Sequence, residues 1–211
     1  MRTNVYVDGF NLYYRAVRGT RYKWLDLGTL CRRLLPQHEV HRIRYFTANV
    51  TPRLNDPDTA TRQQVYLRAL QSISNLSIHF GQFRQRKKVR PLAVSPPNAL
   101  QYVEILDTEE KGSDVNLATY LLVDGFEGDY EQALVISNDS DLALSVRLVR
   151  ERLHRPVGVV NPNLDAKYQM PVELLQAATF VRRLRAKALA QAQFSAALVD
   201  DNGAFAKPAT W

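Results

Sequence analysis

Short apolar segments alternate with amphipathic ones along most of this chain, and this alternation restricts the fold more than any other feature of the sequence. Residues 3–8 (TNVYVD), 133–137 (ALVIS) and 156–160 (PVGVV) have the length and composition of short strands. Further strands are predicted over residues 40–50, 76–83 and 102–106. Apolar residues recur at helical spacing over residues 10–17, 25–35, 59–73, 115–126 and 141–153. Strands that alternate with helices favour right-handed βαβ units, so we predict an α/β fold with a mainly parallel sheet and helices on both faces.

The length and composition indicate one globular domain with an appended segment. At 211 residues the chain is long enough to bury a sizeable core. Apolar residues make up 45% and charged residues 23%, which argues against a disordered or fibrous chain. We expect a domain over residues 1–165, an alanine-rich helical extension over residues 166–199 and a flexible tail over residues 200–211.

The chain carries no sign of export or membrane insertion, and we expect a cytoplasmic protein. The first residues, MRTNVYVDGF, lack the apolar core of a signal peptide, and no apolar run approaches the roughly 20 residues of a membrane span. Cys31 is the single cysteine, which suits a reducing compartment and excludes a disulfide framework. The four histidines do not have the spacing of a zinc site.

The charge of the chain favours a polyanionic partner. The formal net charge is +7, from 28 basic and 21 acidic residues. One basic cluster lies in the proline-broken stretch 84–99, for which we predict a projecting hairpin or loop. Its candidate nucleic-acid-binding residues are Arg84, Arg86, Lys87, Lys88 and Arg90. Arginine forks match phosphate geometry, although a solvated surface is the alternative interpretation of any such cluster.

Four aspartates fall where predicted strands end or helices begin. Asp8 ends the first strand, Asp139 follows the strand ALVIS, and Asp141 begins the next helix. Asp114 begins an earlier helix, on the apolar stripe that should face the sheet. Ligands of open α/β sheets bind outside the carboxyl ends of the strands. We therefore expect the four carboxylates to converge at one edge of the sheet.

A cluster of carboxylates without cysteine or histidine suits a hard divalent cation, Mg²⁺ or Mn²⁺, held partly through water. Such carboxylates repel one another unless a cation neutralises them, and the ion would support hydrolysis of a phosphodiester. Each acid also has a purely structural interpretation. Asp139 suits a helix cap, Asp141 suits the first turn of a helix, and Asp8 suits a turn before Gly9.

Three segments together resemble the signature stretches of the NYN domain, a branch of the PIN-like nucleases, in the bacterial group similar to LabA. They are YVDGFNLYY (6–14), EKGSDVNLATYLL (110–122) and LVISNDSDL (134–142), and their order and spacing match as well. The resemblance runs from about residue 3 to residue 162. It implies a Rossmann-like three-layer αβα fold and a metal-dependent ribonuclease site.

The resemblance also implies roles for single residues. Asp8, Asp114 and Asp139 correspond to metal ligands, and Asp141 completes the catalytic set. The supporting residues are Asn11, Ser137 and Asn138. The related pattern often has a further aspartate six residues after the acid of the second motif, where this chain has Tyr120. That departure bears on the completeness of a second metal position.

The family mechanism implies hydrolysis of RNA by an ion-activated water, which attacks the phosphorus in line and leaves a 5′-phosphate and a 3′-hydroxyl. We expect single-stranded or structured RNA to cross the basic surface, with Lys111 as a candidate phosphate ligand. Tyr13 and Tyr14 are either base-stacking residues or core residues of an amphipathic helix.

Two alternatives stay open. One is a non-catalytic RNA-binding regulatory module, which the departure at Tyr120 favours. The other is a Mg²⁺-dependent phosphohydrolase acting on DNA or a nucleotide, because a fold does not determine its function. The C-terminal segment is a candidate surface for assembly into a homo-oligomer.

Overall fold

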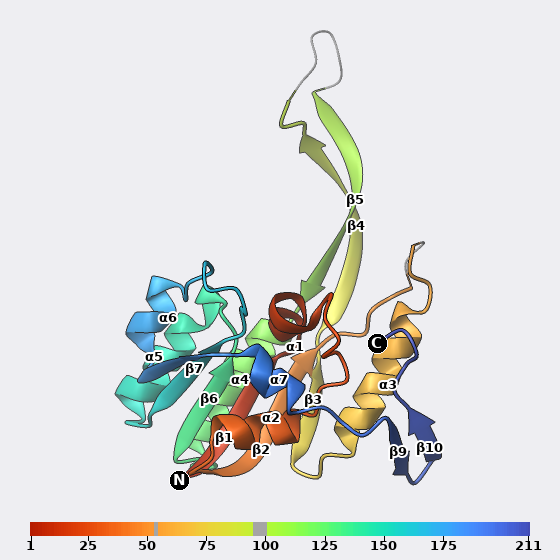
Figure 1. The fold of residues 1–211 in the computed structure, drawn as a ribbon. Coiled ribbons are helices and arrows are strands. Elements are labelled where there is room, and N and C mark those ends of the chain that lie inside the picture. The colour runs from red at the N-terminus through yellow and green to blue at the C-terminus, as the bar shows by residue number, and fades with distance from the viewer. Residues whose placement is uncertain (53–54, 95–100) are drawn as a thin grey trace.

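The computed structural model describes residues 1–52, 55–94 and 101–211. Its centre is a six-stranded sheet with the order β3-β2-β1-β6-β7-β8, in which every neighbouring pair is parallel (Figure 1). The strands are β1 (Arg2–Asp8), β2 (Glu39–Thr47), β3 (Leu76–Phe80), β6 (Gln132–Ile136), β7 (Val157–Asn161) and β8 (Phe180–Arg183). The predicted α/β fold with a parallel central sheet is confirmed.

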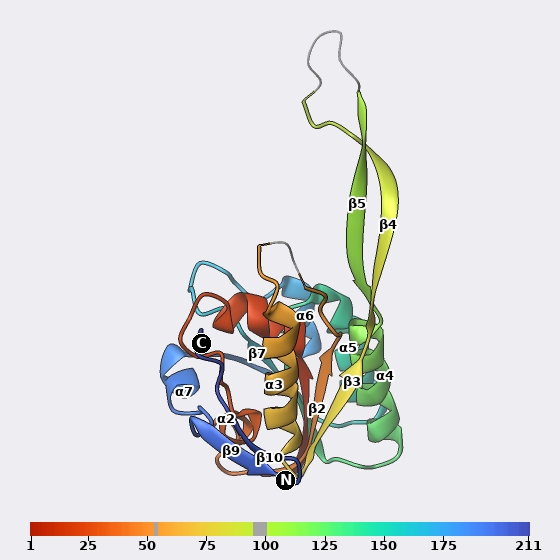
Figure 2. The same ribbon diagram turned by 90° about the vertical axis from the view of Figure 1, so that its right-hand side faces the viewer.

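Helices cover both faces of this sheet and complete a three-layer sandwich (Figure 2). One face carries α1 (Gly9–Leu12), the π-helical turn η1 (Tyr13–Val17), α2 (Leu27–Leu34), α3 (Thr59–Gln71) and α7 (Ala186–Ala190). The other face carries α4 (Ser113–Phe126), the short 3₁₀ helix η2 (Ser140–Leu142), α5 (Ala143–Arg152) and α6 (Val172–Ala177). Within the described ranges, no helix has the length and apolar character needed to cross a membrane.

The central strands are buried on both faces because successive side chains point in opposite directions. On β1, Val5 and Val7 pack into the core beneath α2 and α3, whereas Tyr6 packs into the core beneath α4 and α5. On β6, Leu134 and Val135 divide between the two cores in the same way. Burial on both faces explains why these strands are continuous apolar runs rather than alternating patterns.

The strand order reverses direction next to β1. The chain builds outward from β1 through β2 to β3, and then returns to place β6, β7 and β8 on the other side of β1. In such sheets the connections at the carboxyl ends diverge at the reversal and leave a crevice, which is where ligands bind. The ends of β1 and β6 therefore mark the expected location of a functional site.

Strands β4 (Gln82–Pro91) and β5 (Tyr102–Lys111) form an antiparallel arm that stands away from the body of the molecule (Figures 1 and 2). The arm agrees with the hairpin predicted for the basic stretch, of which residues 95–99 lie outside the described residues. Residues 107–111 continue the strand that was expected over residues 102–106, so β5 reaches down to the body. Pairing with β4 along the whole strand outweighs the turn-forming composition of this segment.

The C-terminal part differs from the helical prediction. Residues 166–199 contain the short helices α6 and α7, but Phe180–Arg183 pairs with β7 as the sixth strand of the sheet. A second hairpin, β9 (Ala197–Asp200) with β10 (Gly203–Ala206), spans the junction between the predicted extension and the predicted tail. The ring of Trp211 lies 5.9 Å from that of Tyr66. Sheet pairing and aromatic packing outweigh the helix propensity of the alanines. The domain boundaries themselves stay a prediction.

A buried ion pair fixes α4 against the sheet. Arg44 of β2 and Asp124 of α4 are 9% and 2% exposed, and Nε and Nη2 of the arginine each donate to a carboxylate oxygen at 2.7 Å. The hydroxyl of Tyr6 donates to the same carboxylate at 2.7 Å. The guanidinium lies 4.3 Å from the ring centre of Tyr120. Full pairing is what makes two buried charges tolerable here.

We predict that Asp124→Ala lowers the free energy of unfolding by about 3–5 kcal/mol, because it leaves the Arg44 charge buried and unpaired. Urea unfolding measures the change. Glu104→Ala is the matched control, since it breaks the solvent-exposed pair with Lys87 on the arm and should change stability little. Equal losses in the two variants would contradict a special role for the buried pair.

Candidate metal centre at the carboxyl edge of the sheet

Asp8 ends the central strand β1 and is held in place by two neighbouring segments. Its carboxylate caps α1 by accepting a hydrogen bond from the backbone N–H of Asn11 at 2.9 Å. Its other oxygen accepts a hydrogen bond from the hydroxyl of Ser137 at 2.8 Å. Asp8 is only 4% exposed and Ser137 is fully buried. The carboxylate is therefore fixed at the reversal point of the sheet, where β1 and β6 end.

The loop after β6 places Asp139 beside Asp8. The hydroxyl oxygen of Ser137 accepts a hydrogen bond from the Asp139 backbone N–H at 3.1 Å, and Asn138 donates its N–H to the side chain of Asn11 at 3.4 Å. Asp139 caps η2, because its carboxylate accepts the N–H of Asp141 at 3.0 Å. Ser137, Asn138 and Asn11 thus lie where the resemblance places supporting residues. Asp139 therefore caps η2 and also lines the cavity beside Asp8.

Asp114 reaches the same region from the first turn of α4. This helix begins after Gly112, whose φ of 102° is a left-handed conformation that favours glycine. Glu110, at the end of β5, accepts hydrogen bonds from the backbone N–H of Ser113 at 3.1 Å and from its hydroxyl at 2.6 Å. A Cβ at Gly81 would lie 2.7 Å from the backbone oxygen of Lys111 and 2.9 Å from the backbone nitrogen of Ser113, so only glycine fits where the arm leaves the body.

These segments line one cavity of about 760 Å³. Among the described residues, four acids and one base line it: Asp8, Glu110, Asp114, Asp139 and Arg15. Among its other lining residues are Phe10, Asn11, Phe83 and Gln85. Three of the four predicted aspartates therefore share a cavity. Asp141 is exposed and is not among the lining residues, so its catalytic role stays a prediction.

The cavity disfavours the ionised form of two carboxyl groups. Burial raises the pKa of Asp8 to about 6, and the charges of Asp139 and Glu110 add to the rise, while hydrogen bonds from neighbouring donors oppose it. Burial and then the charges of Asp8 and Asp139 raise the pKa of Asp114 to about 7. Like charges in a poorly solvated space produce both shifts. A bound cation would relieve the repulsion.

The donor set fits a hard divalent cation in its chemistry and its charge. All candidate donors are carboxylate oxygens, and Arg15, the single cation among the described lining residues, is exposed. In the part of the chain that the structure describes, no three His, Cys, Asp or Glu side chains are close enough together to coordinate one ion directly. Mg²⁺ usually binds through one or two carboxylates and keeps several waters. An ion in this cavity would therefore have few direct protein ligands and would be held largely through water.

The predicted basic residues of the arm mostly do not face this cavity. Side chains alternate along a strand, and Phe83 and Gln85 line the cavity. Lys87 shares their face of β4. The opposite face carries Arg84, Arg86, Lys88 and Arg90. The predicted basic cluster as a whole therefore does not form a surface that leads an RNA backbone into the cavity.

Acids of β5 also neutralise part of the basic charge on the arm. Lys88 forms ion pairs with Asp107, at 2.6 Å, and with Glu109. Lys111 pairs with Glu109 at 2.9 Å, and Lys87 pairs with Glu104 at 3.2 Å. The sequence offered no local sign of the pairs of Lys87 and Lys88, because Glu104 and Glu109 lie 17 and 21 residues away from them and meet them through strand pairing.

Some residues of the site were missed at the sequence level. Glu110 lies beyond the strand expected over residues 102–106. Because β5 continues to Lys111, Glu110 and Thr108 share one face of the strand, and both line the cavity. Arg15 lies four residues after Asn11, so helical spacing places both on one side of α1 and η1. Tyr120 is not a lining residue. It packs over Arg44 instead, on the part of α4 that faces β2.

Comparison with known proteins supports the resemblance. The family model described as "NYN domain" matches residues 2–183. A relative from Pseudomonas putida, named 6-hydroxy-3-succinoylpyridine 3-monooxygenase HspA, is 30% identical over 206 residues, which cover 86% of this chain and 66% of the relative. This chain thus spans just under two thirds of that protein's length.

A solved structure is similar across almost the whole chain. It is a Vibrio parahaemolyticus protein of unknown function, VPA0982, with a TM-score of 0.53 and 16% sequence identity. The alignment covers 97% of this chain and 96% of the Vibrio chain. At this level of identity the similarity shows a shared fold.

We predict that Asp114→Asn stabilises the metal-free protein at pH 8. The pKa of Asp114 is higher in the fold than its ordinary 3.8, so the charged carboxylate reduces stability as the pH rises from 3.8 to about 7. Removing that charge should raise the unfolding midpoint in EDTA by a few degrees, since about 2–4 °C corresponds to 1 kcal/mol in a chain of this size. Asp201→Asn, at an exposed position, is the control. A fall in the midpoint for Asp114→Asn alone would contradict repulsion in the cavity.

Proposed function

Since the chain belongs to the NYN domain family, we propose that it is a metal-dependent ribonuclease that hydrolyses RNA phosphodiester bonds. One observation carries the proposal. Carboxylates from distant segments, at Asp8, Asp114 and Asp139, line a single cavity at the reversal point of a parallel sheet. Acids so close together reduce the stability of the fold, and binding of a cation gives their proximity a function.

Asp8 and Asp139 would hold Mg²⁺ or Mn²⁺, with Asp114 and Glu110 close enough to contribute through water. Bound there, the ion would supply Lewis-acid activation of water and neutralise charge that develops on the phosphodiester. The bonds from Ser137 and from the N–H of Asn11 fix the direction of the Asp8 carboxylate. Such preorganisation is needed for in-line attack on phosphorus.

Arg15 supplies the positive charge that an incoming phosphate needs. It is exposed at the wall of the acidic cavity, and no carboxylate is recorded within ion-pair distance of it among the described residues. Its planar guanidinium matches two phosphate oxygens. Lys87 on the arm shares the face that leads to the cavity. These two residues are better placed for phosphate contact than the rest of the predicted basic cluster.

The Pseudomonas relative favours a second candidate function, oxidation of a hydroxypyridine that carries an acidic side chain. The identity of 30% extends over 86% of this chain, which makes that chemistry worth a direct test. Incubation with 6-hydroxy-3-succinoylpyridine, dioxygen and a reductant would reveal it. Turnover of this compound that survives Asp8→Asn, without any RNA cleavage, would favour the oxidative function over hydrolysis.

We predict that the wild-type protein cleaves single-stranded or structured RNA with Mg²⁺ or Mn²⁺ and that EDTA stops the reaction. Asp8→Asn and Asp139→Asn should each lower the rate by about 100-fold or more, since the loss of a group that merely supports a metal ligand already costs about 10–100-fold. Asp201→Asn should retain the wild-type rate. Gel analysis of end-labelled RNA gives the rates and shows whether the products carry 5′-phosphates.

The same assay separates the alternatives. Cleavage that is indifferent to EDTA and to both substitutions would refute the metal site. RNA binding without cleavage under every condition would favour a non-catalytic regulatory module. Mg²⁺-dependent turnover of DNA or of nucleotides, with RNA intact, would favour a phosphohydrolase of different substrate class.

A further inference from the structure

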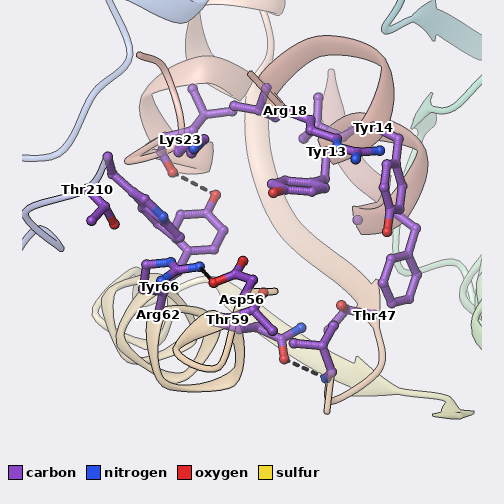
Figure 3. Close-up of a pocket in the computed structure, with 18 of the residues that line it drawn as sticks. Tyr13, Tyr14, Arg18, Lys23, Thr47, Asp56, Thr59, Arg62, Tyr66 and Thr210 are labelled. Carbon is purple, nitrogen blue, oxygen red and sulfur yellow. Dashed lines mark hydrogen bonds and ion pairs between the residues drawn. The ribbon is translucent and has the colours of Figure 1, made fainter. Parts of the chain in front are cut away.

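A second cavity, of about 470 Å³, lies directly beside the acidic one. The two cavities share Phe10, Tyr14 and Val50 as lining residues, so a thin wall separates them. The volume is within the range of small-ligand sites, about 300–1,000 Å³. Its lining comes from α1, η1, α3 and the C-terminal residues Thr210 and Trp211 (Figure 3). None of the predicted metal ligands lines it.

Aromatic rings form much of its surface: Tyr13, Tyr14, Tyr66 and Trp211 all line it. Figure 3 shows Tyr13 and Tyr14 on one side of the cavity and Tyr66 on the other. The hydroxyl of Tyr66 donates to the carbonyl of Leu25 at 2.9 Å, which fixes this ring. The space between such rings suits a planar aromatic group.

The first two rings, Tyr13 and Tyr14, belong to the π-helical turn η1. After one turn of ordinary helix in α1, residues Tyr13–Val17 widen into a π-helix, a rare conformation that is frequent at functional sites. Tyr13 and Tyr14 are 38% and 46% exposed, and their rings meet edge to face at 5.2 Å. The core interpretation of these tyrosines is therefore wrong.

The cavity is positively charged, in contrast to its neighbour. Its charged lining residues are Arg18, Lys23, Arg62 and Asp56. Arg62 is paired with Asp56, and the guanidinium of Arg18 lies 5.3 Å from the ring centre of Tyr14. Two cations thus remain without a matching acid on the described wall. An anionic group is the natural complement of this wall.

The wall toward the acidic cavity is also preformed. The side-chain carbonyl of Gln63 accepts the backbone N–H of Val50 at 2.8 Å, and its amide donates to the carbonyl of Ala48 at 2.9 Å. These bonds tie the segment after β2 to α3. The fold itself therefore holds this part of the wall in place, which lowers the entropic penalty of binding.

We propose that this second cavity binds a nucleotide that neighbours the scissile phosphate, with the base between the tyrosines and a phosphate near Arg18 and Lys23. Aromatic rings and cations together match a nucleotide, and the shared wall leads from them to the carboxylates. As a subsite for cleavage this inference rests on the proposed ribonuclease function. It adds a binding site that the acids alone do not provide.

The test measures binding of adenosine 5′-monophosphate to the full chain by calorimetry in EDTA, with ribose 5-phosphate as the probe without a base. Stacking of one base is worth about 1–3 kcal/mol, so the nucleotide should bind at least about fivefold more tightly. Tyr14→Ala should weaken binding of the nucleotide by about fivefold or more. The control is Tyr168→Ala, which removes a ring of similar exposure, 48%, that also lies beside a cation, Lys167.

Arg18→Ala, at an exposed position, provides a second variant that cannot act through the core, and it should also weaken binding of the nucleotide. Equal affinity for the two probes, or no change in both Tyr14→Ala and Arg18→Ala, would overturn the proposal. Binding of nicotinate without binding of the nucleotide would overturn it too, in favour of a site for small aromatic acids.

Failure of this inference can be told apart from failure of the ribonuclease proposal. Metal-dependent RNA cleavage without nucleotide binding would leave the ribonuclease and refute the second cavity as a nucleotide site. Nucleotide binding that depends on Tyr14, in a protein that never cleaves RNA, would support the cavity and refute the nuclease. In Asp8→Asn, cleavage should be lost while nucleotide binding in EDTA stays as in the wild type.

Discussion

The carboxylate of Asp8, buried at the end of the central strand, is the constraint on which the site depends. Burial of this group is unfavourable, and the fold accepts it because Ser137 and the N-terminus of α1 both donate hydrogen bonds to it. Those two bonds also join the ends of β1 and β6 to the start of α1. A single acid therefore sets the positions of the segments that carry Asn11 and Asp139.

The carboxylates around Asp8 repel Asp114, and contacts at the other end of α4 hold the helix that carries Asp114 in place. Its first turn brings Asp114 into the acidic cavity, while Asp124, nearly three turns later, is locked to Arg44 of β2. The pair also uses Tyr120 and the hydroxyl of Tyr6. The position that carries a further aspartate in related patterns thus contributes here to anchoring the helix rather than to the cavity.

The features that the sequence predicted correctly are those that depend on local sequence patterns. Strand ends, helix starts and the sheet-edge rule placed Asp8, Asp114 and Asp139 together, because parallel strands bring their carboxyl ends to one side. What it missed depends on pairing at a distance or on unusual backbone geometry. Glu110 enters the cavity only because β5 pairs with β4 over its whole length, and the acids of β5 neutralise lysines that had been assigned to RNA. Tyr13 is exposed and lies in a π-turn, a backbone geometry with no recognised signal in the sequence.

In the proposed function, the two cavities would divide chemistry from recognition along one short segment. Asp8, before α1, faces the acids, whereas Tyr13 in η1 faces the aromatic and basic cavity, and Tyr14 belongs to both. Carboxylates at a sheet edge can serve many reactions, and a relative named as a monooxygenase aligns with most of this chain. The acids alone therefore do not select a substrate. The choice of substrate must depend on the residues around the acids. Within the described structure, the aromatic cavity beside Tyr14 has the chemistry to provide this selectivity.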